Sequence, residues 1–502
     1  MTISSLLPIN ESELQALKEH YEANGQGHVF RYFDELEIEQ QAQLLNQLID
    51  LDVERLNQIY KKAIEGAEAA VLGQNTTADP LPDSVFDSVL NASADQLKEW
   101  KTIGLSQIAQ GKVAVILMAG GQGSRLGSSD PKGCYNIDLP SKKSLFQLQA
   151  ERILRLQDIA RQYQKPSQLK DCIIPWYIMT SGPTNTPTMN FFESNNYFGL
   201  KKENVTFFEQ GTLPCLTMDG KIILEAKDKV AIAPDGNGGI YAAVQNKGVI
   251  DSLKERGILY SHCYCVDNCL ARVADPVFIG YSVSKGTDCG VKVVGKTAPE
   301  EPVGVVCVRD GKYGVVEYSE ISQELSEKRQ ADGSLALCAA NIANHFFSTE
   351  FLERVPSFAS QLEYHIAKKK IKYVDENGQV ISPKSNSGMK LECFVFDVFP
   401  FAQSFSVLEV DRKDEFSPLK NAPGTGADCP ETSRRDVVAQ HVRFIEAAGG
   451  KVEHEGDFEK LQFELSSWVS YSGEGLSEIV KGKTIKTPAI IETKEDLIRL
   501  AI

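Results

Sequence analysis

Apolar runs that contain β-branched residues alternate with amphipathic stretches between residues 111 and about 285. Such short apolar runs, bounded by polar or glycine-containing segments, predict buried strands. The strands are expected at Val113–Met118, Ile173–Met179, Val205–Phe208 and Ile258–Val266. Because helical patterns separate these strands, we expect right-handed crossovers and a mainly parallel sheet, whose ligands bind beyond the carboxyl ends of the strands.

The helices of this region are predicted from capping residues and apolar spacing. Ser144 and Gln147 form a capping-box pattern, which opens a helix that extends to about Arg161. The other predicted helices begin at Thr186-Pro187, span Gly239–Arg256 with an interruption near Gly248, and run from Asp275-Pro276 to about Gly286. Strands and helices together predict an α/β fold for this part of the chain.

The pattern changes on the N-terminal side. Residues 10–66 carry helical spacing of apolar positions, with Asn10 or Ser12 as the first cap. Residues 73–96 are rich in Asn, Thr, Asp, Pro and Ser, which is typical of a linker or a surface crossing. We therefore predict an N-terminal helical region with its linker over residues 1–110.

Shorter elements follow residue 287. The runs Val303–Val308 and Tyr313–Tyr318 predict a hairpin, and apolar segments lie around 341–347 and 391–401. The remaining expected elements are a polar stretch at Pro418–Thr432, a helix near 434–447, and short strands with a terminal helix within 451–502. We predict a central domain over residues 111–405 and a smaller α+β domain over 406–502.

Composition narrows the class of protein. The chain has 502 residues, enough for two or three domains, and a formal net charge of −15, which argues against a broad nucleic-acid or anionic-membrane surface. Its 11 cysteines show no disulfide pattern, and residues 1–9 carry no basic segment with an apolar core. No apolar run approaches the ~20 residues of a membrane span. We expect a reduced, cytoplasmic protein.

The first candidate site follows the strand Val113–Met118. Three glycines come next, Gly120, Gly121 and Gly123, and glycine lets a ligand approach backbone N–H groups closely. Arg125 and Lys132 add positive charges that match phosphate oxygens. The segment Lys112–Lys132 therefore predicts a polyphosphate-binding loop at the carboxyl end of a strand.

Other common glycine-rich loops fit the sequence poorly. A dinucleotide-binding fingerprint needs a third glycine where this chain has Leu126. The Gly-Lys-Ser/Thr triplet of a Walker loop is absent here. It occurs as Gly482-Lys483-Thr484, but Ser477 replaces the leading glycine of that motif.

The loop resembles a known signature. Gly120-Gly121-Gln122-Gly123-Ser124-Arg125-Leu126, followed by Pro131-Lys132, is similar to the signature of sugar-nucleotide pyrophosphorylases. With Met118-Ala119 before it and Tyr135 after it, the segment resembles the eukaryotic UDP-N-acetylglucosamine pyrophosphorylases. Bacterial relatives usually carry Thr at the position of Ser124, so the hydroxyl is kept. The resemblance implies a Rossmann-like nucleotidyltransferase domain at the centre of the chain.

Several further residues are candidates whose own chemistry leaves alternatives open. Asp267 ends a predicted strand and is either a Mg²⁺ ligand facing the phosphate loop or a turn cap. The loop Ala233–Gly239 is either a ligand-binding loop or a plain surface turn. Glu317 with Tyr318 and Asn341 could recognise sugar hydroxyls or make structural hydrogen bonds. Isolated lysines are normally solvated surface charges.

The resemblance assigns roles to these positions. It implies that Gln210 reads the uracil edge, Gly236 lies against uridine, and Asn237 binds the sugar. It implies that Lys390 binds UTP and that Lys420 binds the sugar-1-phosphate. Asp267 would hold magnesium on the nucleotide. The implied sets are catalytic Arg125, Lys132 and Lys420; nucleotide-binding Met118, Ala119, Gly120, Gly121, Lys132, Gln210, Gly236, Asp267 and Lys390; and sugar-binding Asn237, Glu317, Tyr318, Asn341 and Lys420.

The function implied is uridylyl transfer from UTP to N-acetylglucosamine-1-phosphate, with Mg²⁺, or Mn²⁺ in its place, as cofactor. The alternatives are a UDP-glucose or broad UDP-sugar pyrophosphorylase and a catalytically silent nucleotide-sugar sensor. The sequence does not distinguish a monomer from a homodimer. A zinc site at His262, Cys263, Cys265 and Cys269 is disfavoured, because no CxxC pair occurs among them and three lie in a predicted buried strand.

Overall fold

The computed structural model describes residues 8–71, 78–164, 171–318, 320–331 and 333–502. It divides into two compact units, each built from three separate stretches of chain. Unit 1 comprises Met1–Thr76, Gln210–Ile240 and Ala359–Asp397, and unit 2 comprises Thr77–Glu209, Tyr241–Phe358 and Val398–Ile502. The sequence-predicted boundaries after residues 110 and 405 stay predictions.

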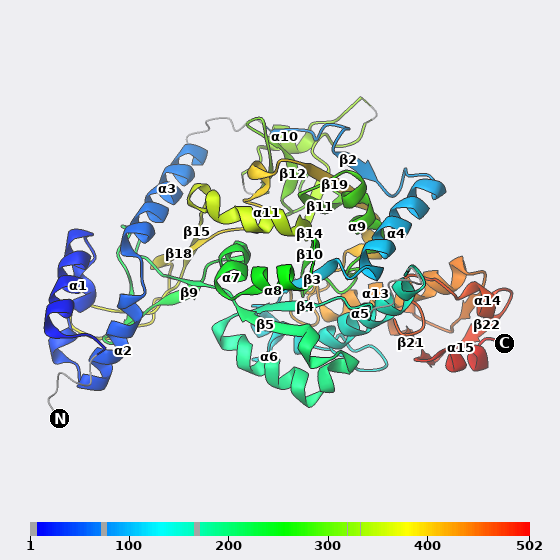
Figure 1. The fold of residues 1–502 in the computed structure, drawn as a ribbon, viewed down its shortest axis with the longest axis horizontal. Helices are drawn as coiled ribbons and strands as arrows, with labels where there is room; N and C mark the ends of the chain where they lie inside the picture. Colours follow the sequence, from blue (N-terminus) through cyan, green and yellow to red (C-terminus); the bar gives the residue numbers. More distant parts are fainter. Residues whose placement is uncertain (1–7, 72–77, 165–170, 319, 332) are drawn as a thin grey trace. The chain divides into compact units, whose positions relative to one another are not determined.

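Unit 2 is organised around a large sheet (Figure 1). The strand order is β2 (Phe86–Ser88), β19 (Phe405–Val410), β11 (Cys289–Gly295), β14 (Ala339–Ser348), β10 (Tyr260–Cys265), β3 (Val113–Met118), β4 (Trp176–Thr180) and β5 (Val205–Glu209). Neighbours on this path are parallel except where β14 pairs antiparallel with β11 and β10. This arrangement confirms the predicted α/β fold with a mainly parallel sheet.

The centre of the sheet is fully buried. All six residues of β3 are buried, as their continuous apolar run predicts for a strand covered on both faces. Its register places Ile116 opposite Cys263 of β10 and Tyr177 of β4. The carboxyl ends of β3 and β10 therefore meet at one edge, where Met118 pairs with Cys265. This edge carries the predicted phosphate-binding loop.

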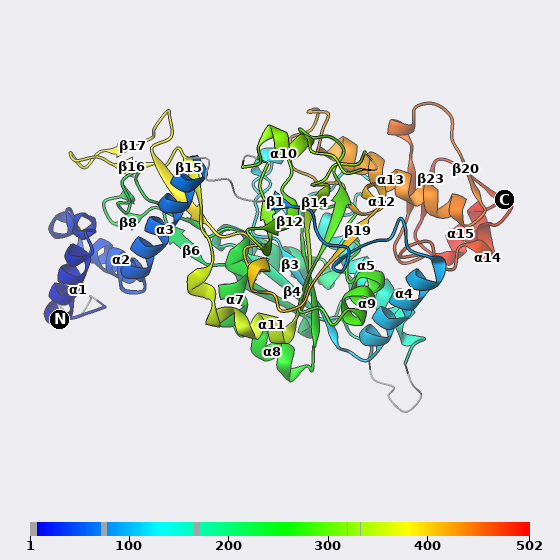
Figure 2. The same ribbon diagram turned by 90° about the horizontal axis from the view of Figure 1, so that it is seen from above.

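Helices of unit 2 pack beside this sheet. They are α4 (Ala94–Ala109), α5 (Leu145–Arg161), α6 (Gly182–Ser194), α7 (Ile240–Asn246, whose first residue belongs to unit 1), α8 (Val249–Glu255), α9 (Pro276–Ser284), α10 (Gln323–Glu327), α11 (Thr349–Arg354) and α12 (Arg412–Glu415). Helices α4 and α9 lie side by side (Figures 1 and 2). Their backbones approach closely, because a Cβ at Gly104 would meet the Pro276 carbonyl at 1.9 Å and one at Gly280 the Trp100 carbonyl at 1.7 Å.

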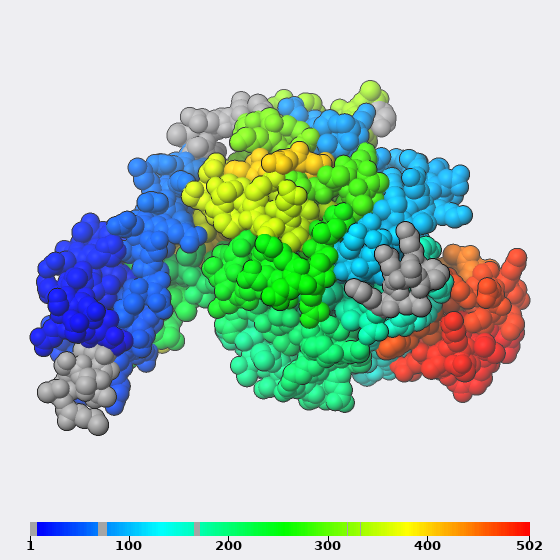
Figure 3. Space-filling view, in the orientation of Figure 1, coloured from blue at the N-terminus to red at the C-terminus, as the bar shows by residue number. Residues whose placement is uncertain are grey.

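The C-terminal part of unit 2 shares an apolar cluster with residues between Leu126 and Leu148 and with Cys269 and Leu270. Helix α13 (Pro430–Ala447) packs with short parallel pairs, β20 (Lys451–Glu453) with β22 (Thr484–Lys486) and β21 (Phe463–Leu465) with β23 (Ala489–Ile491). Helices α14 (Ser477–Val480) and α15 (Lys494–Leu500) complete it. In the space-filling view these residues, orange to red, lie together (Figure 3). The predicted terminal helix is confirmed as α15.

Unit 1 combines the N-terminal helices with small strand pairs. Its helices are α1 (Glu11–Ala23), α2 (Ile38–Ile49) and α3 (Val53–Val71), and Asn10 caps the first of them. Its pairs are β6 (Thr212–Pro214) with β9 (Ile232–Pro234), β7 (Leu224–Ala226) with β8 (Lys229–Val230), β15 (His365–Lys369) with β18 (Gly388–Glu392), and β16 (Tyr373–Val374) with β17 (Val380–Ile381). Tyr21, Leu48, Leu216 and Met389 share the core that joins helices and strands.

Helix starts were the main local errors of the sequence predictions. Helix α6 begins after Ser181, so Pro187 lies inside the helix and does not open it. Ser144 caps α5 by accepting the N–H of Gln147, but the Gln147 amide donates to Glu151 instead of completing the capping box. Helix α13 begins at Pro430, inside the stretch predicted to be polar loop.

The stretch 73–96, predicted to be a linker or a surface crossing, contributes two short strands to unit 2 where the structure describes it. Residues 72–77 of the predicted linker lie outside the described residues, but β1 (Ala78–Asp79) pairs with β12 (Val305–Arg309) and β2 joins the sheet beside β19. The predicted hairpin is confirmed as β12 with β13 (Lys312–Val316). No helix within the described ranges is long and apolar enough to cross a membrane.

Candidate functional site

The first glycine-rich loop closes on itself at the carboxyl end of β3. The Gly123 N–H donates to the Asp130 carbonyl at 2.9 Å, and the Lys132 N–H donates to the Gly121 carbonyl at 3.1 Å. Ser181, the cap of α6, donates its hydroxyl to the Gly120 carbonyl at 2.7 Å. These bonds hold the loop backbone in a fixed form, which is the condition for pre-organised anion binding.

The glycine at position 121 is not required by packing. A Cβ built there would meet no atom of the described residues within 4 Å, and its φ lies outside the left-handed range. The residue is exposed. Space above a glycine that the fold does not need is the arrangement expected where a ligand approaches the backbone.

Lys132 links the loop to two other segments of unit 2. Its Nζ lies 3.8 Å from Asp267 Oδ2 and donates to the Leu419 carbonyl at 3.2 Å. The Asp267 side chain is 24% exposed, so the carboxylate can be reached from solvent. Asp267 lies two residues after the end of β10, and its backbone carbonyl accepts the Leu419 N–H at 2.8 Å.

Lys420 belongs to the same place. Burial raises the pKa of the Cys265 thiol, Asp267 raises it further, and the ammonium groups of Lys132 and Lys420 act in the opposite direction. Both lysines are therefore close enough to act on the same thiol at the end of β10. The structure brings together Lys132, Asp267 and Lys420, three of the sequence-predicted site residues.

The remaining loop residues are placed differently. Arg125, in the short 3-10 turn Ser124–Leu126, is exposed. Met118 and Ala119 are buried, and their backbone is used by the sheet, since the Ala119 N–H donates to Met179 and the Met118 carbonyl accepts from Val266. These two residues connect the loop to the sheet through their backbone hydrogen bonds.

A second group of predicted residues gathers around Gly304. Asn341 lies in β14 opposite a register shift of β11, and its N–H donates to the Gly304 carbonyl at 2.9 Å. A Cβ at Gly304 would lie 2.7 Å from Glu317 Oε1. Glu317 and Asn341 therefore flank the same glycine. Tyr318, the residue after Glu317 in the chain, is 55% exposed.

The second glycine-rich loop lies in unit 1 and is held by the segment after β18. The Gly238 N–H donates to the Cys393 carbonyl, the Cys393 N–H donates to the Asp235 carbonyl, both at 2.8 Å, and Asn237 Oδ1 accepts the Val395 N–H at 2.9 Å. The side-chain oxygen of Asn237, a residue predicted to bind the sugar, thus has a structural partner.

Gln210 and Lys390 also belong to unit 1. Gln210 donates its amide to the Gly236 carbonyl at 3.4 Å. Lys390, on β18, pairs with Ala367 of β15. Burial raises the pKa of the Cys215 thiol, the Lys390 ammonium group acts in the opposite direction, and the resulting pKa is about 11. The structure thus gathers Gln210, Gly236 and Asn237 in one loop region of this unit.

Asp235 was not singled out from the sequence, although it lies in this loop. Burial raises the pKa of its carboxyl to about 7, against the opposing effects of its backbone, Gln210 and Arg55. Its buried Oδ1 has no hydrogen-bond partner among the described residues. A Pro-Asp-Gly sequence normally signals a solvated turn, so nothing in the sequence indicates this burial.

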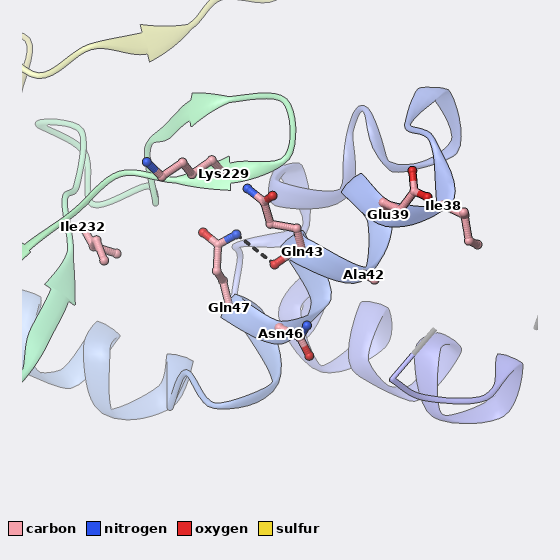
Figure 4. Close-up of a pocket in the computed structure, with 8 residues that line it drawn as sticks. All are labelled: Ile38, Glu39, Ala42, Gln43, Asn46, Gln47, Lys229 and Ile232. Atoms are coloured by element: carbon pink, nitrogen blue, oxygen red, sulfur yellow. Dashed lines mark hydrogen bonds between the residues drawn. The ribbon is translucent and has the colours of Figure 1, made fainter. Parts of the chain in front are cut away.

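A cavity of about 670 Å³ in unit 1 contains none of the predicted site residues. One face of α2 and strands β8 and β9 form it, and Gln47 donates to the Gln43 carbonyl at 2.9 Å along the helix (Figure 4). Its one lysine, Lys229, forms an ion pair with Glu225. This lining offers no cluster of cations for a polyphosphate.

Metal binding at this place would depend on a single carboxylate, that of Asp267. Across the described residues, no group of three or more His, Cys, Asp or Glu is arranged for a metal. Mg²⁺ is commonly held by one or two carboxylates with water and substrate phosphates, so Asp267 fits that ion. The His262 ring is engaged at Nε2 by Asn344 and at Nδ1 by the Ala274 N–H, which excludes it as a zinc ligand in this arrangement.

Comparisons with known proteins agree with this geometry. Residues 57–425 match the UDPGP family, described as UTP–glucose-1-phosphate uridylyltransferase. The UDP-N-acetylhexosamine pyrophosphorylase-like protein 1 of Xenopus tropicalis is 46% identical over 493 residues, 94% of this chain and 96% of that protein. The UDP-N-acetylglucosamine diphosphorylase 2 of Arabidopsis thaliana is 44% identical over 494 residues, 97% and 95% of the two chains.

A solved structure gives the same answer. The uridine diphosphate N-acetylglucosamine pyrophosphorylase from Trypanosoma brucei, crystallised with an inhibitor, is 31% identical and has a TM-score of 0.77. The match covers 92% of this chain and 94% of that one. The chain therefore belongs to the UDPGP family, as the resemblance at its first glycine-rich loop predicts.

Proposed function

We propose that the protein transfers the uridylyl group of UTP to N-acetylglucosamine-1-phosphate, forming UDP-N-acetylglucosamine and pyrophosphate. The observation that carries the proposal is the meeting of Lys132, Asp267 and the segment of Lys420 where β3 and β10 end. The relatives that cover almost the whole chain carry names of this activity. The geometry supplies the charges that the reaction needs.

The reaction needs charge neutralisation more than acid–base chemistry. A phosphate oxygen of the sugar-1-phosphate forms a bond to the α-phosphorus of UTP, and the bond from that phosphorus to the bridging oxygen breaks. The electron pair leaves with pyrophosphate. Because the attacking oxygen is already anionic, no general base is required, and positioning with electrostatic stabilisation supplies the catalysis.

Each cation has a separate task. Lys132, held between Asp267 and the Leu419 carbonyl, binds triphosphate oxygens, and exposed Arg125 adds a second positive charge from the loop. Lys420 holds the attacking phosphate. Asp267 would hold Mg²⁺, or Mn²⁺ in its place, and the bound ion neutralises charge that develops on the triphosphate.

Recognition of base and sugar is assigned to the other groups. Gln210 and Gly236 would contact uridine, and Lys390 would contact UTP. Asn237, with Glu317, Tyr318 and Asn341, would recognise the sugar and its acetamido group. A cytoplasmic location remains a prediction from the sequence.

The test is pyrophosphate release from UTP and Mg²⁺ with a panel of sugar-1-phosphates. We expect a strong preference for N-acetylglucosamine-1-phosphate over glucose-1-phosphate, because a pocket built to bond a polar group loses affinity when that group is missing. Equal specificity constants would favour a broad UDP-sugar pyrophosphorylase. Binding of UTP without turnover on any sugar would identify a nucleotide-sugar sensor.

Two lysine variants provide a matched control for this test. Lys420→Ala should impair use of the sugar phosphate far more than UTP binding, since a charge-assisted contact to phosphate contributes about 1.5–3 kcal/mol. Lys368→Ala removes an equal charge from the exposed end of β15 and should leave both quantities unchanged. Similar effects of the two changes would remove Lys420 from the site.

A further inference from the structure

We propose that Asn268 is a positioning residue that fixes Lys420 relative to Asp267 and Lys132. The inference rests on the proposed function for its kinetic consequence, but the contacts themselves do not. Asn268 directly follows Asp267 and is only 3% exposed. A buried amide that satisfies its hydrogen bonds with a distant segment fixes the two segments in register.

The Asn268 side chain ties two loops together. Its Nδ2 donates to the Glu415 carbonyl at 2.7 Å, and its Oδ1 accepts the Ser417 N–H at 3.0 Å. The same Oδ1 accepts the Leu270 N–H at 3.2 Å, which also shapes its own turn. Only an amide of this length donates and accepts in this way, because a carboxylate lacks the donor.

The segment of Glu415, whose carbonyl accepts from Asn268, is itself held in place by an ion pair. Glu415 is 3% exposed, and its carboxylate binds the ammonium group of Lys292, a residue of β11 with no exposed surface. Lys292 also binds Asp275 at 2.5 Å. Asn268 therefore connects the loop after β10 to a segment that the centre of the sheet holds in place.

Backbone bonds carry this registration to the predicted catalytic groups. The Cys269 N–H donates to the Ser417 carbonyl at 3.0 Å, and the Leu419 N–H donates to the Asp267 carbonyl at 2.8 Å. Leu419 then accepts Lys132 Nζ at 3.2 Å, one residue before Lys420. A shift of residues 415–420 would move both the Lys132 partner and the Lys420 side chain.

A purely structural role predicts a different outcome. If Asn268 only completed its own turn through Leu270, its loss would lower stability and reduce the apparent kcat through the amount of folded enzyme, with KM unchanged for both substrates. If Asn268 acts through Lys420, removing the Asn268 side chain impairs the use of the sugar phosphate. Its effect then disappears once Lys420 is gone, since residues that act through one another are not additive.

The kinetic experiment is a double-mutant cycle of Asn268→Ala and Lys420→Ala in the full chain. We measure kcat/KM for N-acetylglucosamine-1-phosphate at saturating UTP, UTP affinity by calorimetry, and thermal unfolding. We expect Asn268→Ala to lower kcat/KM by roughly 10–100-fold in the parent and by less than about threefold in the Lys420→Ala background. Equal losses in both backgrounds would overturn the proposal.

Hydrogen exchange tests the positioning without turnover. We expect the amides of Leu419 and Lys420, which donate to Asp267 and Asp428, to exchange faster in Asn268→Ala. The control is Asn204→Ala, which removes a buried asparagine that accepts from Arg256 before the start of β5, at the opposite edge of the sheet. Unchanged exchange of residues 415–421 in the Asn268 variant overturns the proposal.

The two readouts separate this inference from the proposed function. A parent protein without pyrophosphate release on any sugar phosphate refutes the proposed function, while exchange still decides whether Asn268 holds the segment. If Asn268→Ala fails to fold, Asn268→Asp serves instead. It keeps the acceptor for Ser417 but loses the donor to Glu415, and the same exchange and kinetic outcomes apply.

Discussion

The two glycine-rich loops of this chain look alike in sequence but differ in what surrounds their glycines. In the loop of unit 2, a Cβ at Gly121 would meet open space. In the loop of unit 1, a Cβ at Gly236 would lie 2.3 Å from the Cys393 carbonyl oxygen, and one at Gly238 2.7 Å from Cys393 and Phe394. The first loop can accept a side chain at Gly121, and the second cannot accept one at either position.

This difference separates two reasons for glycine. In the second loop the backbone itself demands it, since Gly236 has φ 90° and ψ 174°, a conformation almost restricted to glycine. At Gly121 the fold makes no such demand, which is the arrangement expected where a ligand approaches the backbone. Glycine content alone therefore indicates neither function nor packing, and only the neighbours distinguish them.

The largest expected effect is on folding, at the packed loop. Gly236→Ala should lower the free energy of unfolding by about 2–5 kcal/mol, because both the steric overlap and the backbone conformation cost energy. Chemical denaturation followed by circular dichroism measures this. Gly66→Ala, in helix α3 of the same unit with no atom within 4 Å, is the control and should add about 0.5–1 kcal/mol. A stable Gly236→Ala protein would contradict the packing argument.

The next effect is on turnover, beside the open loop. Asp267→Asn keeps size but removes the charge next to Lys132, so the lysine loses its partner and, on the proposed function, Mg²⁺ would lose its ligand. We expect kcat to fall by roughly 10²–10³, the scale of losing one fixed electrostatic group. Added Mg²⁺ should recover part of the loss.

Thermal unfolding of the same Asp267→Asn sample serves as its control. The Asp267 carboxylate is 24% exposed and reaches solvent, so it is not a core packing group and the melting temperature should stay close to that of the parent. A lower melting temperature with normal turnover would instead make Asp267 a structural turn cap.

A smaller effect is expected at Gly121 itself. Gly121→Ala should leave the melting temperature unchanged, because the Cβ meets no atom and φ is ordinary. Turnover should fall by roughly tenfold, about 1.4 kcal/mol, since the methyl group enters the space where phosphate oxygens approach the backbone. Steady-state kinetics with UTP tests this, and normal turnover would show that the space above Gly121 is not used.

The sequence predicts the central strands well because burial on both faces leaves a continuous apolar run, as in β3. It predicts helix starts less well. Ser181 caps α6 by a reciprocal contact with Thr184, and this is invisible when Pro187 offers a stronger start signal. Strand β14 was reduced to a short apolar segment because polar residues such as Asn341 and Asn344 interrupt its pattern.

The residues of the candidate sites also differ in how well the sequence predicts them. Residues near a motif, such as Lys132, or at a strand end, such as Asp267, can be found from local sequence. Asn268 and Asp235 cannot, because their significance comes from contacts with Glu415 and burial in a loop that Cys393 closes. Such long-range partners leave no mark at a fixed spacing.

Asp235 is a residue of the second glycine-rich loop that does not fit a loop shaped by packing alone. It lies in the packed loop, yet its buried carboxyl has a pKa raised to about 7, and its Oδ1 lacks a partner among the described residues. A loop shaped only by packing would gain nothing from a charge that is costly to bury. Packing therefore does not explain this carboxyl.

The pH dependence of stability follows from this shift. The folded protein keeps the Asp235 proton up to about pH 7, while the unfolded chain releases it near pH 4. The contribution of Asp235 to stability is therefore complete below about pH 4 and is lost as the pH rises to about 7.

The substitution Asp235→Asn removes that pH-dependent loss of stability. We expect the variant to be more stable than the parent at pH 8 by on the order of 1 kcal/mol, and to gain less at pH 5, where both side chains are neutral in the folded state. Denaturant melts of both proteins at the two pH values measure the difference, in which all other titrating groups cancel. If the gain is the same at both pH values, Asp235 is not buried as an acid in solution. If the gain appears only at pH 8, the loop retains a destabilising carboxylate, and packing alone does not account for the second glycine-rich loop.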